Sequence, residues 1–275
     1  MRKRRRNRPS YGQGYARNRA EAAYPGLRDG LVFNWHGPLG PTGLKAKDTS
    51  GYGNDGTLTN MDPATDWVMT PVGYALEFDG TDDYILMPAV CCSDLQTFTV
   101  AMCIKTPASF NATDMLCERS NDIITNGWEI ALRSGRLAFA YNDGAIRGWY
   151  SSVSTLSVNT WYSVTITRNK SSGLIQYYYD GIYQDSDSGT TGTIINNAAT
   201  QFDVGAKFSA GTNSLWSGSV AICSIWDKVL LPNKIQLLYR DPHAIVRLKQ
   251  QVFFASAGAP PSFAGSNLIL GGGVL

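Results

Sequence analysis

The chain has 275 residues, of which 43% are hydrophobic and 17% charged, and its formal net charge is +2. It contains 28 glycines and 14 tyrosines but only four glutamates, a composition that favours strands and turns over helices. A chain of this length can bury a sizeable core in one large domain. No apolar run approaches the roughly 20 residues of a membrane-spanning helix. The basic start is not followed by the apolar stretch of a signal peptide, so we do not expect export by the general secretory route.

Residues 1–28 are predicted to form a flexible basic arm. Residues 1–19 hold eight basic residues and no acidic one, while the remaining sequence carries 16 basic against 22 acidic residues. Such an arm can anchor the protein to a polyanion, which could be nucleic acid, an acidic protein surface or anionic lipid. A solvated tail that only aids solubility is the alternative. The anchoring candidates are Arg2, Lys3, Arg4, Arg5, Arg6 and Arg8.

Residues 29–242 are predicted to form an all-β body. Residues 98–104 and 161–167 show the period-two alternation of half-buried strands. Two further segments are predicted hairpins, one turning at Ser134-Gly135 and the other at Asp180-Gly181. Strands spaced by such turn signals favour a two-sheet antiparallel sandwich over parallel α/β units.

The end of the body differs from the rest. Residues 220–226 are apolar on both faces, which is typical of a strand covered on both sides. Pro232 suits the first turn of a short helix, and Asp241-Pro242 should end that helix. Residues 243–275 are predicted to form an extended C-terminal tail.

Six motifs, in order, resemble one known family. They are Asp48 to Asn60 (DTSGYGNDGTLTN), Ala75 to Ile85 (ALEFDGTDDYI), Phe98 to Ile104 (FTVAMCI), Asn159 to Ile166 (NTWYSVTI), Tyr179 to Gly181 (YDG), and Ser217 to Trp226 (SGSVAICSIW) followed by Leu237 to Tyr239. Together they resemble the laminin-G-like domains of the concanavalin A-like lectin/glucanase group. The resemblance implies a jelly-roll sandwich and does not specify function, because the same fold carries lectins, adhesins and glycosidases.

One further stretch points to a biological setting. Residues 238–247 (LYRDPHAIVR) are similar to the ending of laminin-G-like proteins encoded by tailed bacteriophages. The similarity implies a virion component, made in the host cytoplasm, whose partners are other virion proteins and further copies of itself.

The five cysteines are predicted to be free thiols. Cys103 and Cys223 lie in apolar strand-like runs, where a buried thiol is the favoured interpretation. Cys91 and Cys92 are adjacent, which is poor geometry for a disulfide between them. No spacing typical of zinc occurs.

The distribution of acids and histidines argues against an enzyme. Glycoside hydrolysis needs two carboxylates that flank the scissile bond, and Glu21, Glu77, Glu118 and Glu129 do not show the one-strand spacing of the glucanases with this fold. Only two histidines occur, His36 and His243. They are far apart in the sequence and favour neither a catalytic triad nor a histidine metal site.

Calcium is the plausible ion. Asp48, Asn54, Asp79 and Asp82 are candidate ligands, with Asp55 and Asp83 nearby, because they lie in two glycine-rich loops and calcium prefers six to eight oxygen ligands. The alternative is that these side chains form turns with their own backbone. The family's closing strand often carries two acids, and residues 220–226 carry none, which puts a metal role in doubt.

Glycan binding requires exposed aromatic rings. Trp128, Tyr141, Trp149 and Trp216 are the candidates, with Tyr150 beside them, because they lie in or near loop-like segments. The alternative places them in the core or in a subunit interface, and Trp35 and Trp161 are assigned to the core.

These observations predict a non-enzymatic recognition module of a phage virion, as a capsid decoration, head-surface or tail-associated protein that its arms anchor and that can bind glycans. Two alternatives remain open. One is a free or cell-surface lectin assisted by calcium, and the other is a jelly-roll shell protein whose basic arm binds the packaged genome through phosphate contacts.

Overall fold

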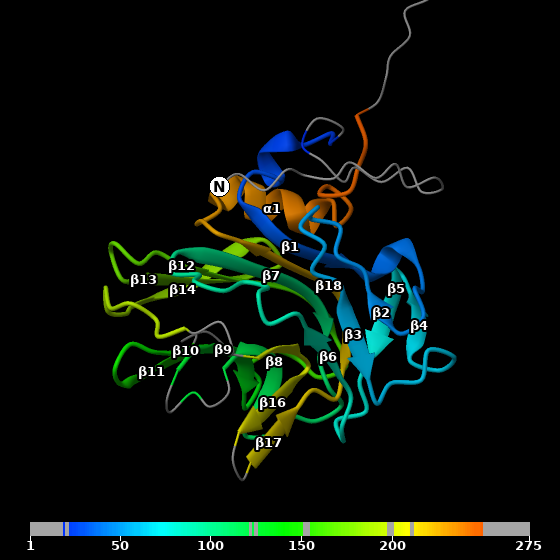
Figure 1. Cartoon of the computed structure of the whole chain (residues 1–275), viewed down its shortest axis with the longest axis horizontal. Coiled ribbons are helices and arrows are strands. Elements are labelled where there is room, and N and C mark those ends of the chain that lie inside the picture. Colours follow the sequence, from blue (N-terminus) through cyan, green and yellow to red (C-terminus); the bar gives the residue numbers. More distant parts are fainter. Residues whose placement is uncertain are drawn as a thin grey trace, which may run out of the picture.

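The computed structural model describes residues 19, 22–120, 123, 126–150, 155–196, 201–209 and 212–249, and within these ranges it leaves out the side chains of residues 149–150, 207–209 and 212–213. The described chain confirms the predicted all-β jelly-roll sandwich: two antiparallel sheets pack face to face, with one short α-helix outside them (Figure 1). The basic residues Arg2 to Arg8 lie outside the described residues.

Sheet I has the strand order β14-β13-β12-β7-β18-β5-β4, and β1 pairs with β18 beside β5. Its strands are β1 (Leu31–His36), β4 (Trp67–Thr70), β5 (Gly73–Glu77), β7 (Phe98–Lys105), β12 (Trp161–Arg168), β13 (Leu174–Tyr179), β14 (Ile182–Ser188) and β18 (Ser219–Trp226).

Sheet II has the order β11-β10-β9-β8-β15-β6-β3-β2. Its strands are β2 (Lys45–Ala46), β3 (Gly56–Thr59), β6 (Tyr84–Met87), β8 (Asp114–Arg119), β9 (Trp128–Arg133), β10 (Arg136–Asn142), β11 (Ile146–Tyr150) and β15 (Phe202–Val204). A small separate hairpin consists of β16 (Ala206–Ser209) and β17 (Thr212–Leu215), and it lies against β8.

The alternation predicted for the central strands places the core between the sheets. In β7, Phe98, Val100, Met102 and Ile104 are buried in the main core cluster, as predicted from the period of two. All eight residues of β18 are buried, which confirms the prediction of a strand covered on both sides. One face of β18 meets sheet II, and the other lies under the helix and the terminal segments.

The two predicted hairpins form at the predicted turns. β9 and β10 join at Ser134-Gly135, and β13 and β14 join at Asp180-Gly181. All four turn residues have positive φ, between 49° and 77°. This is the type I′ geometry whose twist matches that of the flanking strands.

The outer face of sheet I is covered by the helix α1 (Pro232–Arg240) and by both ends of the described body (Figure 1). Ile235 of α1 packs in one buried cluster with Leu27, Trp226 and Ile245. Pro232 occupies the first helical turn and Asp241 caps the C-terminal end, as predicted.

The packed residues extend beyond both ends of the predicted 29–242 body. Ala22 forms a β-bridge with Leu248, and the guanidinium of the buried Arg28 donates to the carbonyl oxygens of Ile245, at 3.1 Å, and Thr49, at 2.8 Å. The short 3₁₀ helices η1 (Pro25–Leu27) and η2 (Gly37–Leu39) flank β1. Residues 22–28 and 243–248 are therefore part of the folded unit, because their apolar side chains complete the cover of sheet I.

Candidate ligand-binding site

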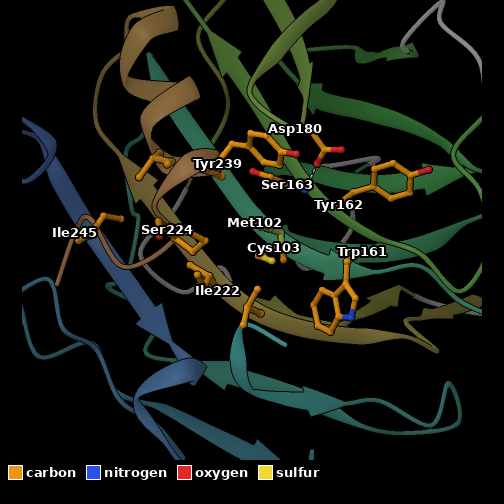
Figure 2. A pocket seen from close by; sticks show the side chains of 14 residues that line it. Met102, Cys103, Trp161, Tyr162, Ser163, Asp180, Ile222, Ser224, Tyr239 and Ile245 are labelled. Atoms are coloured by element: carbon orange, nitrogen blue, oxygen red, sulfur yellow. Dashed lines mark hydrogen bonds between the residues drawn. The ribbon is translucent and has the colours of Figure 1, made fainter. Parts of the chain in front are cut away.

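A hollow of about 150 Å³ opens on the outer face of sheet I, beside α1. Its floor is formed by side chains of β7 and β18, its walls by the start of β12, the turn between β13 and β14, and the C-terminal half of α1. Figure 2 shows Tyr239 and Asp180 at one end and Trp161 at the other, with Cys103 and Ile222 between them. The hollow exists because α1 covers only part of the sheet.

The alternation of the strands decides which side chains reach this hollow. In β12, Tyr162, Val164 and Ile166 face the core, as predicted. The odd-numbered residues of the strand, Trp161 and Ser163, therefore face outward and line the hollow. Trp161 is half-buried and packs at the edge of the small buried cluster of Ala75, Ala221 and Ile222, not in the core between the sheets to which the sequence assigned it. Trp35, in contrast, is buried as predicted.

Asp180 brings the charge of the site. It occupies the first position of the β13–β14 turn, and its Oδ1 accepts the backbone N–H of Ser163 at 2.8 Å, while its own N–H donates to the Ser163 carbonyl at 2.8 Å. This pair fixes the carboxylate against β12. Among the described residues no hydrogen bond to Oδ2 is present, so this oxygen can accept from a ligand.

The floor of the hollow is apolar. Ala101, Cys103 and Ile222 form it, and Ser224, which is buried, directs its hydroxyl away to Asn34 Oδ1 at 2.6 Å. Burial and the nearby Asp180 carboxylate raise the pKa of the Cys103 thiol to about 12. Cys103 is therefore a neutral, apolar surface at physiological pH and not a nucleophile.

Two histidines meet close to this hollow. His36 ends β1 and pairs in register with Ile222, and its Nε2 lies 3.0 Å from Nδ1 of His243. The sequence distance between them, which argued against any joint role, is bridged because residues 242–248 return along sheet I. Burial, aided by His243, lowers the pKa of His36 to about 3, so His36 is neutral in the folded protein.

The aromatic residues proposed for glycan binding lie elsewhere. Trp128, Tyr141 and Trp216 are each 0% exposed. They belong to the core between the sheets, which corrects their assignment as ligand contacts, because a ring without exposed surface cannot stack on a sugar. The side chains of Trp149 and Tyr150 lie outside the described residues.

The two calcium loops do not contribute equally. Both oxygens of Asp48 are used by the protein itself: they accept from the backbone N–H groups of Ser50 and Asn54 and the Ser50 hydroxyl in the same loop, and from the backbone N–H of Asn34 in β1. Asp48 and Asn54 therefore fit the alternative, a turn built on an aspartate.

The second loop gathers three acids. Asp79, Asp82 and Asp83 place carboxylate oxygens within 4.8 Å of one another. Asp79 and Asp83 also bind backbone N–H groups of the same loop. Oxygen ligands suit calcium, and three carboxylates supply only part of its usual six to eight ligands.

Strand pairing brings together two glutamates that the sequence keeps apart. Glu118 of β8 and Glu129 of β9 are directly opposite in register and face outward from sheet II. Glu129 forms an ion pair of 2.7 Å with Arg133, and both glutamates are at most 2% exposed. A search for acids along one strand misses such a pair. Their burial keeps substrate away from the arrangement that glycoside hydrolysis would need.

The same row of sheet II continues to Asp203 of β15, which pairs with Glu118. Burial raises the pKa of Asp203 to about 7, although Gln201 donates a hydrogen bond to it at 2.7 Å. Next to this row, Ala131, Ala140 and Gly148 floor a second hollow of about 290 Å³. The hollow exists because these three residues have small side chains or none. Glu129 and Arg133 close one side of it and neutralise each other through their ion pair.

Comparison with known proteins agrees with the fold. A family model described as the concanavalin A-like lectin/glucanases superfamily, of laminin-G type, matches residues 79–236, which is more than half of the chain. No curated protein matches the chain. No helix in the described residues has the length and apolar character needed to cross a membrane.

Solved structures with a similar fold include the binding domain of Paraclostridial Mosquitocidal Protein 1, at 20% identity and a TM-score of 0.58 over 78% of this chain and 52% of that one. Domain 4 of AbnA, an extracellular arabinanase from Geobacillus stearothermophilus solved with arabinotriose, matches at 17% identity and a TM-score of 0.57, over 76% of this chain and 98% of that one.

Botulinum neurotoxin type C, whose cell entry depends on two ganglioside molecules, matches at 17% identity and a TM-score of 0.57, over 78% of this chain and 52% of that one. The chain thus spans about half the length of the two toxin structures. At these identities the likeness concerns the fold alone.

Proposed function

Because the chain belongs to the concanavalin A-like lectin/glucanases superfamily, we propose that it is a non-enzymatic recognition module that binds carbohydrate in the hollow beside α1. One observation carries the proposal: Tyr239 and the Asp180 carboxylate at one end of the hollow, and Trp161 at the other, enclose an apolar floor. Ligand sites typically combine a mostly apolar lining with a few placed polar groups.

The chemistry of a sugar matches this arrangement. One face of a pyranose ring carries C–H groups, and burying them against an aromatic ring removes apolar surface from water on both sides. The hydroxyls around the ring are donors, and Asp180 Oδ2 is an acceptor held in place by the Ser163 contacts. The volume of about 150 Å³ corresponds to roughly five water molecules, which suits one terminal sugar unit better than a long chain.

A glycan array followed by titration of the best ligand tests this site. Tyr239→Ala should weaken binding by at least tenfold, or about 1.4 kcal/mol, because this tyrosine is 46% exposed at the mouth of the hollow. Tyr52→Ala is the matched control, since Tyr52 is also exposed, at 61%, but lies in the loop after Asp48. Equal loss in both variants, or no binding to any glycan, contradicts the proposal.

The acceptor role of Asp180 has its own test. Asp180→Asn keeps an oxygen for the Ser163 N–H but removes the charge, so the turn should stay intact and affinity should fall by about 1.5 to 3 kcal/mol, the range for a hydrogen bond to a charged group. Unchanged affinity with an unchanged unfolding midpoint removes Asp180 from the site.

We further propose that the module is mounted on a phage virion by its terminal arms, in contact with other virion proteins and with copies of itself. The arginine-rich residues 1–19 and the similarity of residues 238–247 to phage laminin-G-like endings support this setting. Mass spectrometry of purified particles should then find the protein at a fixed copy number. A protein that never co-sediments with particles is a free lectin instead.

The remaining alternatives differ in what they require. A shell protein whose arm binds the genome should bind DNA with an affinity that falls steeply as salt rises. A calcium-assisted lectin should bind its sugar only with calcium, and Asp82→Asn should weaken sugar binding or raise the calcium concentration that binding needs. Sugar binding that is equal in calcium and in a chelator leaves the hollow beside α1 as the complete site.

A further inference from the structure

Four of the five cysteines meet in one part of the core. Cys91 and Cys92 lie in the turn between β6 and β7, Cys117 lies in β8, and Cys223 lies in β18. All four belong to the main buried core cluster, although up to 132 positions separate them in the sequence. The fifth, Cys103, faces the hollow on the other side of sheet I.

The adjacent pair is the closest contact of this group. The Sγ atoms of Cys91 and Cys92 are 3.4 Å apart, and both side chains are buried. In an extended strand, neighbouring side chains point to opposite faces. For this reason the adjacent positions of Cys91 and Cys92 in the sequence argue against a disulfide between them. The structure departs from that geometry at Cys92, whose φ is 56°.

The backbone of this turn is fixed from both sides. The Cys91 N–H donates to the Pro88 carbonyl at 2.8 Å, and the Cys91 carbonyl accepts from Nη1 of the buried Arg119 at 3.0 Å. Asp94 also has a positive φ, 65°. A non-glycine residue in the left-handed region is uncommon and persists only when its surroundings hold it there. Here they hold two thiols side by side.

We propose that Cys91 and Cys92 form a redox-controlled pair, which closes into a disulfide between adjacent residues when the protein meets a small-molecule disulfide. The Sγ atoms must approach from 3.4 Å to the bond length of about 2.05 Å, a change that side-chain rotation can supply. Adjacent Cα atoms lie about 3.8 Å apart, closer than in most disulfides, so the bond is reversible and not a permanent link.

The reaction balances as thiol–disulfide exchange. The Cys92 thiolate attacks one sulfur of oxidised glutathione and releases one glutathione thiolate. The Cys91 thiolate then attacks Cys92 Sγ and releases the second. The two cysteines lose two protons and two electrons, and the glutathione disulfide gains both. Burial raises the pKa of Cys92, so the exchange is slow in the folded protein.

The pair also protects the rest of the core. Oxidation between neighbours joins no separate strands and leaves the positions of β8 and β18 unchanged. A bond from Cys91 or Cys92 to Cys223 would instead link the β6–β7 turn to sheet I. The short distance between Cys91 and Cys92 therefore directs oxidation to the harmless product.

Oxidation of the whole folded chain by glutathione disulfide, followed by alkylation in denaturant and peptide mass mapping, tests the inference. We expect three alkylated cysteines out of five, a mass lower by two hydrogens, and one bond between Cys91 and Cys92. Cys223→Ser should still lose two reactive thiols. Cys91→Ser and Cys92→Ser should each keep four alkylatable thiols, and Cys103→Ser is the control for the isolated thiol.

Three results overturn the inference. One is a bond from either cysteine to Cys117 or Cys223. Another is a mixed glutathione adduct as the only final product. The third is five intact thiols in the folded chain after an exposure long enough to form the Cys91–Cys92 bond in the same chain unfolded in urea. Because Cys223→Ser retains both members of the pair, loss of folding in Cys91→Ser or Cys92→Ser leaves the test decisive.

Discussion

His36 and Asp203 are buried titratable side chains whose pKa values move in opposite senses for the same reason. Burial disfavours the charged form, so the pKa of the histidine falls to about 3 and the pKa of the carboxyl rises to about 7. At pH 7 the folded chain therefore holds His36 neutral, while Asp203 is far less ionised than an exposed aspartate. Acid should destabilise the folded chain through His36, whereas a rising pH should destabilise it through Asp203. A variant at each residue separates the two contributions to the free energy of unfolding.

Lowering the pH should destabilise the protein through His36. Its folded pKa lies below the unfolded value of 6.5, so the unfolded chain binds the proton more strongly and stability falls as the pH drops below about 6.5. Between pH 7.5 and pH 5 this amounts to about 2 kcal/mol. Urea unfolding of the wild type and His36→Gln at both pH values measures it. A loss of equal size in the variant assigns the effect to other groups.

Raising the pH should destabilise the protein through Asp203. Its folded pKa lies above the unfolded value of 3.8, so the folded chain binds the proton more strongly, and stability falls as the pH rises from about 4 to about 7 and levels off above 7. Asp203→Asn should remove roughly 2 to 3 kcal/mol of this dependence between pH 8 and pH 5. Asp82→Asn, at an exposed acid in another loop, is the control. A pH profile that Asp203→Asn leaves unchanged contradicts the assignment.

The β13–β14 turn is the element that connects the candidate site to the helix. A Cβ on Gly181 would lie 2.9 Å from Gln236 Cα and 3.0 Å from Tyr239 Cβ, so the turn packs directly against α1. This contact sets the distance between Asp180 and Tyr239, which lie together at one end of the hollow. The turn thus shapes the site as well as joining two strands.

Gly181→Ala should therefore affect both stability and ligand binding. Gly53→Ala is a matched control, because Gly53 has a φ of 77°, close to the 75° of Gly181, but open space around it. Both variants carry the cost of a side chain in the left-handed region, about 1 kcal/mol. Gly181→Ala should cost about 1 to 3 kcal/mol more, because α1 must move. Equal unfolding free energies in the two variants refute the packing argument.

The elements show what the sequence could predict. Local signals decided the strands around Val100 and Ile166, both hairpin turns and the helix after Pro232, because alternation, turn chemistry and proline geometry act over a few neighbouring residues. The candidate site was missed because its parts come from β7, β12, β18 and α1. Trp161 belongs to the outward set of its strand, and only the partial cover by α1 makes that face a hollow.

The same limit explains the other differences. Trp128 and Tyr141 stand beside loop-like segments in the sequence, yet they fall on the inward face of the β9–β10 hairpin. His36 meets His243, and Cys91 and Cys223 share one core cluster, only through the return of distant segments. The pairing of strands depends on residues far apart in the chain. The local patterns of a single sequence therefore do not predict which residues lie opposite one another.

At the scale of the whole molecule, the C-terminal segment acts as a part of the body. Ala244 and Ile245 are buried, and the Ile245 carbonyl accepts from Arg28. Ile245 and Pro242 also line the hollow. Cover of sheet I and the shape of the site therefore depend on the same few residues.

Two truncations test this dependence. A chain ending at Pro242 loses the buried Ile245 and the partner of His36, and should unfold with at least about 3 kcal/mol less free energy than the full chain. A chain ending at Lys249 keeps every described contact of the segment and should match the full chain. Chemical unfolding of both measures the difference. Similar stability of the two truncations shows that sheet I does not need the segment.

The bridge between Ala22 and Leu248 has a geometrical consequence. The described body begins and ends on two neighbouring strand-like segments, with Ala23 N–H donating to the Arg247 carbonyl at 2.8 Å. Entry and exit thus share one point of the surface, which is the arrangement that tolerates circular permutation and insertion into a host loop. We therefore expect residues 22–248, inserted into a loop of a host protein, to keep their fold without strain at either junction.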